Sequence, residues 1–388
     1  MSDDILWIDT ADALTGLCNR LAQSPWLCLD TEFLREKTYR PQLCLIQVAD
    51  ADTIACIDPL AIDDLEPLNA LLRDERITKV LHSASQDLEI FAIREGFVPA
   101  PVFDTQVAAA LMGMGDQVGY GRLVEEMLGV QLDKAHSRTD WTRRPLSRAQ
   151  IEYAADDVRW LRKIYLRQQQ WLTERGRLDW LQADFAALTD PARYQPDPEA
   201  AWLRVKGIQR LRPAQLAVLR ELAAWREREA VASDRPRRWI LKDEVLIDLA
   251  RRRPKNESEL ADIRGLETRT IQRHGRVLLE LIESASALPR EEWPALPERK
   301  RLQPRQEAII DLLMASLRQS ALEAEISPQA IAGRKDLERL VLGERALPLL
   351  RGWRKELVGE RLLDLIEGRS ALGIDAEGLV VVPRGEDR

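Results

Sequence analysis

The stretch Trp26-Leu27-Cys28-Leu29-Asp30-Thr31-Glu32-Phe33 places two acidic residues inside an otherwise apolar run. Side chains at alternate positions of a β-strand share a face, so a strand here sets Asp30 beside Glu32. Two neighbouring carboxylates in apolar surroundings repel each other and lose hydration, and a divalent cation between them is the simplest compensation. The alternative is an edge strand with both acids in solvent, but the apolar neighbours favour a central strand.

The segments that follow predict a sheet with helices around it. Strands are expected at 43–49, 53–58 and 79–82, with the first two joined by a short acidic turn. Helices are expected near 64–73, 86–95, 104–113 and 119–128, and in a long segment that Ser147 caps and that extends past Tyr165. Hairpin-connected strands followed by alternating helices and strands indicate an α/β domain over residues 1–190, a mixed sheet flanked by helices.

Three further residues are candidates for a site because of their positions. Asp87 stands in the first turn of a predicted helix, where the helix dipole alone would also favour an acid. Tyr153 and Asp157 lie four residues apart on the long helix and share a face, although an ordinary partly buried pair has the same spacing. Asp156 points about 100° away from Asp157, toward the surface or a supporting position. Taken singly these residues decide nothing, but with the two strand acids they make four carboxylates and a tyrosine.

The order of these five residues resembles the DEDD exonuclease superfamily in its tyrosine subfamily. Histidine-type members carry His five residues before the last Asp, where this chain has Glu152. Four stretches are similar to the ribonuclease D family: Asp30-Thr31-Glu32-Phe33, Thr38-Tyr39-Arg40-Pro41-Gln42-Leu43-Cys44-Leu45-Ile46-Gln47, Asp140-Trp141-Thr142-Arg143-Arg144-Pro145-Leu146 and Tyr153-Ala154-Ala155-Asp156-Asp157. The resemblance extends over nearly the whole chain, and none of the five key positions departs from it.

This resemblance implies a ribonuclease H-like fold and phosphodiester hydrolysis with two divalent metal ions, Mg²⁺ or Mn²⁺. Asp30 would bridge the two ions. Glu32 and Asp157 would bind the ion that activates water, and Asp87 would serve the other. A tyrosine with a pKa near 10 is a poor base at neutral pH, so Tyr153 is expected to orient the attacking water. The implied product is a nucleoside 5′-monophosphate released from the 3′ end.

The distribution of charge agrees with a carboxylate site and a polyanionic partner. Residues 1–100 hold 18 Asp/Glu and 8 Lys/Arg, a net charge of −10, whereas residues 203–253 hold 14 Lys/Arg and 7 Asp/Glu, a net charge of +7. Carboxylates suit Mg²⁺ or Mn²⁺, and with only three histidines and no Cys-x-x-Cys pair a zinc site is not expected. A basic region attracts a phosphate backbone.

Compartment and assembly follow from weaker signals. The four cysteines are expected to be buried thiols in a reducing compartment. No apolar run approaches the roughly 18 residues of a membrane helix, and the N-terminus lacks a secretory pattern. We therefore expect a cytoplasmic protein with no membrane contact, and a monomer, because no coiled-coil pattern demands association.

The second half of the chain is expected to be helical and repeated. A linker is predicted at 189–198 and another Pro-rich stretch at 289–304. Leu211-Arg212-Pro213-Ala214-Gln215 corresponds to Leu302-Gln303-Pro304-Arg305-Gln306, and the ends of both copies also match. The repeat predicts two all-α bundles, at 203–288 and 300–372, which resemble the helicase-and-RNase-D C-terminal (HRDC) domains of the family. Residues 373–388 are expected to be a loose tail.

The basic clusters of the first bundle are candidate RNA contacts, with a solvated or ion-paired surface as the alternative. The candidates are Arg237, Arg238, Arg251, Arg252 and Arg253. Trp239 is expected to be a core anchor rather than a base-stacking residue, and Gln47 and Tyr39 are candidate contacts to the terminal nucleotide. The resemblance implies an RNA partner, in particular tRNA precursors with 3′ extensions. A DNA 3′-5′ exonuclease and a non-catalytic RNA-binding protein remain the alternatives.

Overall fold

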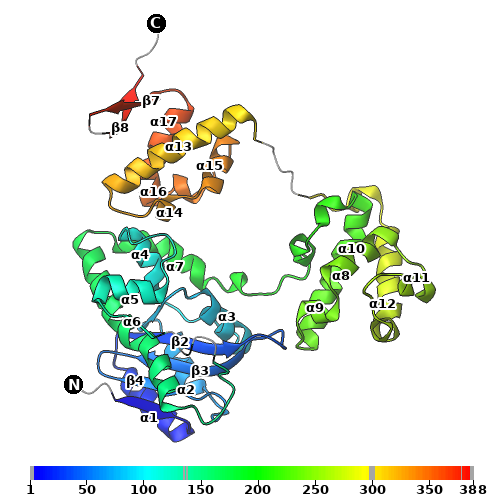
Figure 1. The fold of residues 1–388 in the computed structure, drawn as a ribbon, viewed down its shortest axis with the longest axis horizontal. Coiled ribbons are helices and arrows are strands. Elements are labelled where there is room, and N and C mark those ends of the chain that lie inside the picture. The colour runs from blue at the N-terminus through cyan, green and yellow to red at the C-terminus, as the bar shows by residue number, and fades with distance from the viewer. Residues whose placement is uncertain (1–3, 134–135, 137–138, 297–301, 377, 385–388) are drawn as a thin grey trace.

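The computed structural model describes residues 4–133, 136, 139–296, 302–376 and 378–384 (Figure 1). An α/β domain comes first, followed by two helical bundles. No helix in these ranges is long and apolar enough to cross a membrane.

The α/β domain is built on a six-stranded mixed sheet of order β1-β4-β3-β2-β5-β6. Its strands are β1 (Ile5–Ile8), β2 (Trp26–Leu34), β3 (Gln42–Ala49), β4 (Ile54–Ile57), β5 (Thr78–Leu81) and β6 (Val102–Asp104). The predicted strands are confirmed, and β1 and β6 add one strand at each edge. Strand β2 pairs antiparallel with β3 and parallel with β5, so the decisive stretch is a central strand, as predicted.

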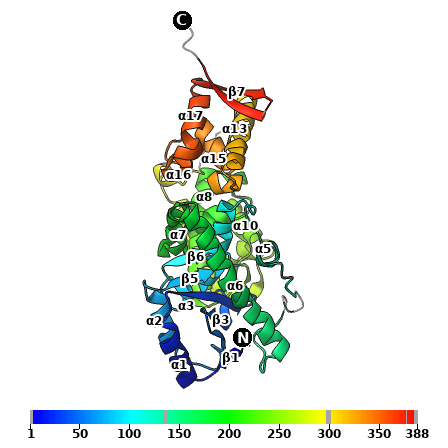
Figure 2. The ribbon, with the colours of Figure 1, turned by 90° about the vertical axis from the view of Figure 1, so that its left-hand side faces the viewer.

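Helices cover both faces of this sheet, as Figure 2 shows with α1 and α2 on one side and α6 on the other. They are α1 (Ala11–Leu21), α2 (Glu66–Arg73), α3 (Ser85–Arg94), α4 (Thr105–Leu111), α5 (Tyr120–Leu128), α6 (Arg148–Glu174) and α7 (Gln182–Thr189), with 3₁₀ turns at Leu178–Leu181 and Pro191–Arg193. Alternation in β2 divides its side chains between two cores. Leu27 and Leu29 pack with α1, α2 and α3, whereas Cys28 faces Ala154 and Val158 of α6.

The first bundle follows the linker. It contains α8 (Pro213–Ala232), α9 (Arg237–Ile240), α10 (Asp243–Arg252), α11 (Glu257–Ala261) and α12 (Thr268–Ser286), with 3₁₀ turns at Ala201–Arg204, Ile208–Arg210 and Arg290–Glu292. Its core is formed by α8, α10 and α12. The bundle lies beside the α/β domain in Figure 1, with α9 next to the connection between β2 and β3.

The second bundle begins with the same local pattern as the first. It contains α13 (Pro304–Glu323), α14 (Pro328–Ile331), α15 (Arg334–Val341), α16 (Gly352–Arg354) and α17 (Glu360–Ile366), with a 3₁₀ turn at Pro348–Leu350 and a π-helical turn at Lys355–Gly359. Helices α8 and α13 each span 20 residues, start at a proline and have Gln at the third position, whose side chain accepts the N–H of the capping residue. Each is followed by a residue with positive φ, Asp234 (47°) and Glu325 (55°). This parallel is what the sequence repeat predicts.

The C-terminal segment differs from the prediction. Strands β7 (Ser370–Asp375) and β8 (Gly378–Pro383) form an antiparallel hairpin, so the expectation of a loose tail from 373 is wrong for these residues. Leu379 and three consecutive valines favour an extended backbone, and all of these side chains except Val382 are partly buried. The last residues of the predicted tail, 385–388, lie outside the described ranges, as do 300 and 301 of the predicted second bundle.

Candidate active site

Strand β2 holds the two acids that the sequence singled out. Asp30 and Glu32 share the face of Cys28, which α6 covers, and both are partly buried. Burial, together with the charges of Asp157, Asp87 and Glu32, raises the pKa of Asp30 well above its usual value. Burial and the charges of Asp157 and Asp87 raise the pKa of Glu32 to about 8. The reading of these residues as solvated edge acids is therefore wrong.

Asp87 reaches the same region from the other side of the strand. Strand β5 pairs with β2 only as far as Cys28, and α3 begins beside the part of β2 beyond it. The hydroxyl of Thr31 donates to Oδ1 of Asp87 at 2.5 Å. Burial raises the pKa of Asp87 to about 6, although the hydrogen bond from Thr31 opposes the rise. Asp87 is thus a buried, oriented carboxylate.

Helix α6 supplies the remaining acid and the tyrosine. Ser147 and Gln150 form the predicted capping box at its start. Burial, then Asp156 and Asp87, raise the pKa of Asp157 to about 7. The hydroxyl of Tyr120 donates to the carbonyl oxygen of Asp157 at 2.6 Å, which anchors this turn of the helix. Asp156 instead pairs with Arg159, in keeping with its predicted supporting position.

Tyr153 lies among these carboxyls. Burial, followed by the charges of Asp157, Glu32 and Asp30, raises its pKa to about 12. Its ring stacks on Trp141 at a centroid distance of 6.3 Å and an interplanar angle of 27°. Tyr153 is therefore a protonated phenol held by an aromatic neighbour.

The four carboxyls fit a hard divalent cation by charge and by chemistry. In the described residues, the strongest charges acting on their pKa values are those of other carboxyls, and none is a cation. Oxygen donors without a positive partner are what Mg²⁺ or Mn²⁺ would compensate. Over the same residues, no three acidic, histidine or cysteine side chains are gathered closely enough to ligate one ion as they stand. Ligation would therefore require the side chains to rotate toward a common centre.

Two supports of this site were not foreseen from the sequence. Asp104, at the end of β6, accepts the N–H groups of Ser83 and Ala84 at 3.0 and 2.9 Å and so fixes the turn that leads to Asp87. Arg144 donates to both carboxylate oxygens of Asp58 at 2.6 and 2.7 Å and holds the segment before α6 against the sheet. The only sequence signal for the contacts of Asp104 was an acid at the end of a short strand. The contact of Arg144 with Asp58 joins residues 86 positions apart and has no local signal.

The two candidate nucleotide contacts occupy different places. Gln47 pairs in register with Asp30 and is fully buried, with no hydrogen-bond partner for its amide among the described residues. Tyr39 is buried between the α/β domain and the first bundle, where its hydroxyl donates to Glu227 Oε1 at 2.5 Å. Tyr39 in this arrangement contacts the bundle, so it is not open to a nucleotide.

The basic candidates of the first bundle also divide. Arg237 pairs with buried Glu227, and its Nη2 donates to the Tyr39 hydroxyl at 2.9 Å, which makes it an interdomain residue. Arg238 is exposed, as are Arg251 and Arg252 at the end of α10, and Arg253 caps that helix with φ of 50°. Trp239, expected in the core, is 53% exposed. That expectation is wrong because the four-residue helix α9 points this side chain outward.

Comparison with known proteins agrees with this fold. Family models for 3′-5′ exonucleases and HRDC domains match residues 5–171 and 215–282. The ribonuclease D of Acidiphilium cryptum is 44% identical over 97% of this chain and 96% of that protein, and that of Gluconacetobacter diazotrophicus is 44% identical over 98% and 97%. The crystal structure of Escherichia coli RNase D, described as an exoribonuclease involved in structured RNA processing, matches with a TM-score of 0.83 at 36% identity, over 94% of this chain and 99% of that one. With similarity of this degree along nearly the whole of each chain, the protein belongs to the ribonuclease D family and carries its 3′-5′ exonuclease and HRDC domains.

Proposed function

We propose that this protein is an exoribonuclease that removes nucleotides one at a time from the 3′ ends of structured RNA, such as tRNA precursors, and releases nucleoside 5′-monophosphates. One observation carries the proposal. Burial and neighbouring carboxylates raise the pKa values of four carboxyls from β2, α3 and α6 around a protonated tyrosine, and among the described residues no cation is a cause of these shifts. Such a cluster costs stability, and cation-assisted phosphodiester hydrolysis gives it a use.

Asp30, Glu32, Asp87 and Asp157 would hold two divalent ions, Mg²⁺ or Mn²⁺. When bound, the ions supply positive charge at the attacking and leaving oxygens of an in-line displacement. Asp30, whose pKa is raised by the charges of all three other acids, would contribute to holding both ions. Thr31 holds Asp87 ready for the same task.

Tyr153 acts by orientation. A phenol with a pKa of about 12 keeps its proton at neutral pH, so it does not abstract one from water. Its hydroxyl can hydrogen-bond the attacking water, and its ring is steadied by Trp141. We therefore expect that losing the hydroxyl lowers the rate more than it weakens RNA binding.

RNA is the proposed substrate because an acidic active site is joined to a basic helical region with a net charge of +7 over residues 203–253. The E. coli relative is itself described as processing structured RNA. Residues 300–372 would be a second HRDC-like bundle, given the repeated start of α8 and α13. Four buried, unpaired cysteines suit a reducing compartment, so we propose that the protein is cytoplasmic. We also propose that it acts as a monomer.

The test compares the full-length protein with Asp30→Asn on a tRNA bearing a labelled 3′ extension and on a DNA oligonucleotide of the same sequence. We expect Mg²⁺- or Mn²⁺-dependent release of mononucleotides from the RNA by the wild type, none by the variant, and equal RNA binding by both. Preferred digestion of the DNA would favour a DNA exonuclease. RNA binding without hydrolysis at any Mg²⁺ or Mn²⁺ concentration would favour a non-catalytic RNA-binding protein.

A further inference from the structure

Trp239 is an exposed aromatic residue that belongs neither to the core of the α/β domain nor to the core of the first bundle. The chain has eleven tryptophans, all within the described ranges, and Trp239 is the only one that is more than half exposed. A single exposed aromatic side chain does not by itself indicate a partner, so its surroundings decide whether a ligand fits there.

The surroundings of Trp239 are cationic. The guanidinium of Arg235 lies 5.8 Å from the centre of the Trp239 ring. Arg238 is adjacent and exposed. Throughout the described part of the chain, no carboxylate forms an ion pair with either arginine. An exposed aromatic ring beside two arginines without such an ion pair suits a base and its phosphates, because every base has a π-face and the phosphates are anionic.

Residues near Trp239 contact the connection that follows β2, the strand that carries Asp30 and Glu32. Arg237, two residues before Trp239, bonds to the Tyr39 hydroxyl, and the backbone N–H of Arg40 donates to Asp234 at 2.9 Å. Tyr39 follows Glu32 by seven residues, a span of at most about 25 Å. A strand with a rise of roughly 3.4 Å per nucleotide covers this span in about seven nucleotides.

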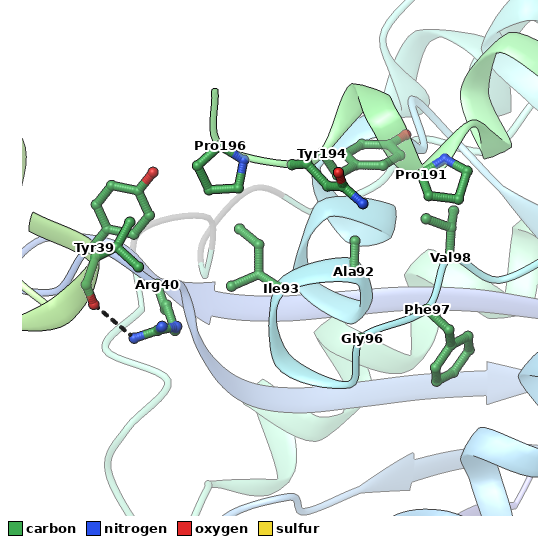
Figure 3. Close-up of a pocket in the computed structure, with 12 residues that line it drawn as sticks. Tyr39, Arg40, Ala92, Ile93, Gly96, Phe97, Val98, Pro191, Tyr194 and Pro196 are labelled. Atoms are coloured by element: carbon green, nitrogen blue, oxygen red, sulfur yellow. Dashed lines mark hydrogen bonds between the residues drawn. The ribbon is translucent and has the colours of Figure 1, made fainter. Parts of the chain in front are cut away.

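Apolar packing and polar contacts both hold this junction, where Tyr39 packs with Ala230 of α8 and Ile240 of α9. A cavity of about 280 Å³ separates Tyr39 from the linker residues Tyr194 and Pro196 and from Ile93 on α3 (Figure 3). This packing and the polar contacts of Tyr39 and Arg40 together fix the position of α9, the helix that carries Trp239.

We propose that Trp239 is a stacking platform for a base of the RNA several nucleotides upstream of the 3′ end, with Arg235 and Arg238 contacting the flanking phosphates. This inference rests on the exoribonuclease function proposed above. It makes RNA length a determinant of affinity, since only a strand long enough to reach from Asp30 to Trp239 gains the contact. Losing one stacked base weakens binding roughly 5- to 100-fold.

The first experiment measures binding of labelled single-stranded RNAs of 2, 4, 8, 12 and 16 nucleotides in EDTA, which separates this site from hydrolysis. Trp239→Ala should weaken binding of the longest RNAs roughly 5- to 100-fold and that of the dinucleotide less than twofold, and Trp239→Phe should restore most of the loss. For Arg235→Ala and for Arg238→Ala, the slope of the logarithm of the binding constant against the logarithm of the salt concentration should become smaller by about one. Leu322→Ala, at a residue 73% exposed on the second bundle, is the matched control and should change nothing.

The second experiment follows hydrolysis of the same RNAs. Trp239→Ala should raise KM for the long RNAs and leave kcat as it is. An equal loss on the dinucleotide, or no loss on the longest RNA, would overturn the platform. So would a dimer of the wild type that Trp239→Ala dissolves, which would assign this surface to a second copy of the chain. If no RNA is hydrolysed by the wild type but the length-dependent loss of binding persists, the exoribonuclease function fails and the platform stands.

Discussion

The hydroxyl of Thr31 donates a hydrogen bond of 2.5 Å to Oδ1 of Asp87 and so ties strand β2 to helix α3 within the acidic site. Thr31→Val keeps the volume but leaves this buried carboxylate without the donor. We expect metal affinity and kcat to fall about 10-fold or more, as for other lost partners of ligands, and the free energy of unfolding to fall by about 1–3 kcal/mol. Calorimetric metal titration measures the metal affinity, single-turnover hydrolysis measures the rate, and urea denaturation measures the free energy of unfolding. Thr31→Ser keeps the donor and should behave as wild type, so equal losses in both variants would contradict the role of the hydroxyl.

The acidic cluster predicts how the stability of the metal-free protein depends on pH. The folded-state pKa values of Asp87, Asp157 and Glu32 rise to about 6, 7 and 8, above their unfolded values. The folded state therefore binds more protons than the unfolded state from about pH 4 to pH 8, and its stability falls as pH rises through this window.

Asp30→Asn removes one of the repelling charges. In EDTA the variant should melt higher than wild type at pH 8, by roughly 2–4 °C per kcal/mol of relief, and the difference should shrink at pH 5. Mg²⁺ should raise the melting temperature of the wild type only. A variant that melts lower than wild type at pH 8 would show that repulsion is not the dominant effect.

The parts of the site that could be predicted from sequence are pairs of residues whose spacing within one strand or helix places them on the same face. Asp30 and Glu32 alternate on one strand, Tyr153 and Asp157 are four apart on one helix, and the geometry of each element fixes such pairs without knowledge of the rest. Asp87 needed the complete set of motifs, because its own position is equally typical of a helix start.

The features that were missed either depend on partners distant in sequence or lack a clear local pattern. Strand β6 has three residues and is defined by its pairing with β5, and the grip of Arg144 on Asp58 exists only once the sheet has formed. Trp239 lies on a helix of four residues, too short for a periodic pattern to reveal which side is buried. The glycines and charged residues of hairpin β7–β8 led to the expectation of a loose tail, although its run of valines favours a strand.

The contact between the α/β domain and the first bundle depends on Glu227. This carboxyl is 1% exposed; burial would raise its pKa, but hydrogen bonds from Arg237 and Tyr39 lower it below the usual value. The Glu227 carboxylate therefore stabilises this contact above its unfolded pKa, near 4.5, and this stabilisation is lost as the pH falls through its pKa in the folded state. At pH 7.5, Glu227→Gln should loosen the bundle, so that trypsin cleaves the linker around Arg193 faster and KM for long RNAs rises. Glu280→Gln breaks the exposed pair with Arg276 on α12 and is the control, because such pairs contribute only about 0.3–0.5 kcal/mol. Equal cleavage of the two variants would show that Glu227 does not hold the domains together.

The second bundle is joined to the α/β domain by an aromatic contact of a different kind. The rings of Trp180 and Trp353 stack at 4.4 Å with an angle of 5°, and Nε1 of Trp353 donates to the carbonyl oxygen of Trp180 at 3.0 Å. Beside them, the N–H of Ser327 donates to the Ala110 carbonyl at 2.8 Å and the N–H of Gly115 donates to Ser327 Oγ at 3.0 Å. Because these backbone groups exchange only when the bundle lifts away, their amide exchange reports docking directly.

Trp353→Ala should remove the stack and weaken docking by up to about 3 kcal/mol, the lower end of the loss for a buried tryptophan, since this ring is only partly buried. We expect hydrogen exchange at Ser327 and Gly115 to accelerate up to about 100-fold, because each 1.4 kcal/mol changes the opening equilibrium tenfold. Exchange within β2 and hydrolysis of a dinucleotide should stay at wild-type levels, because the acidic site lies in the α/β domain and shares no residue with this interface. Leu322→Ala on the same bundle controls for loss of apolar surface. If exchange at the two amides is unchanged in Trp353→Ala, the backbone contacts alone dock the bundle; if β2 exchanges faster as well, the stack supports the whole α/β domain rather than the interface.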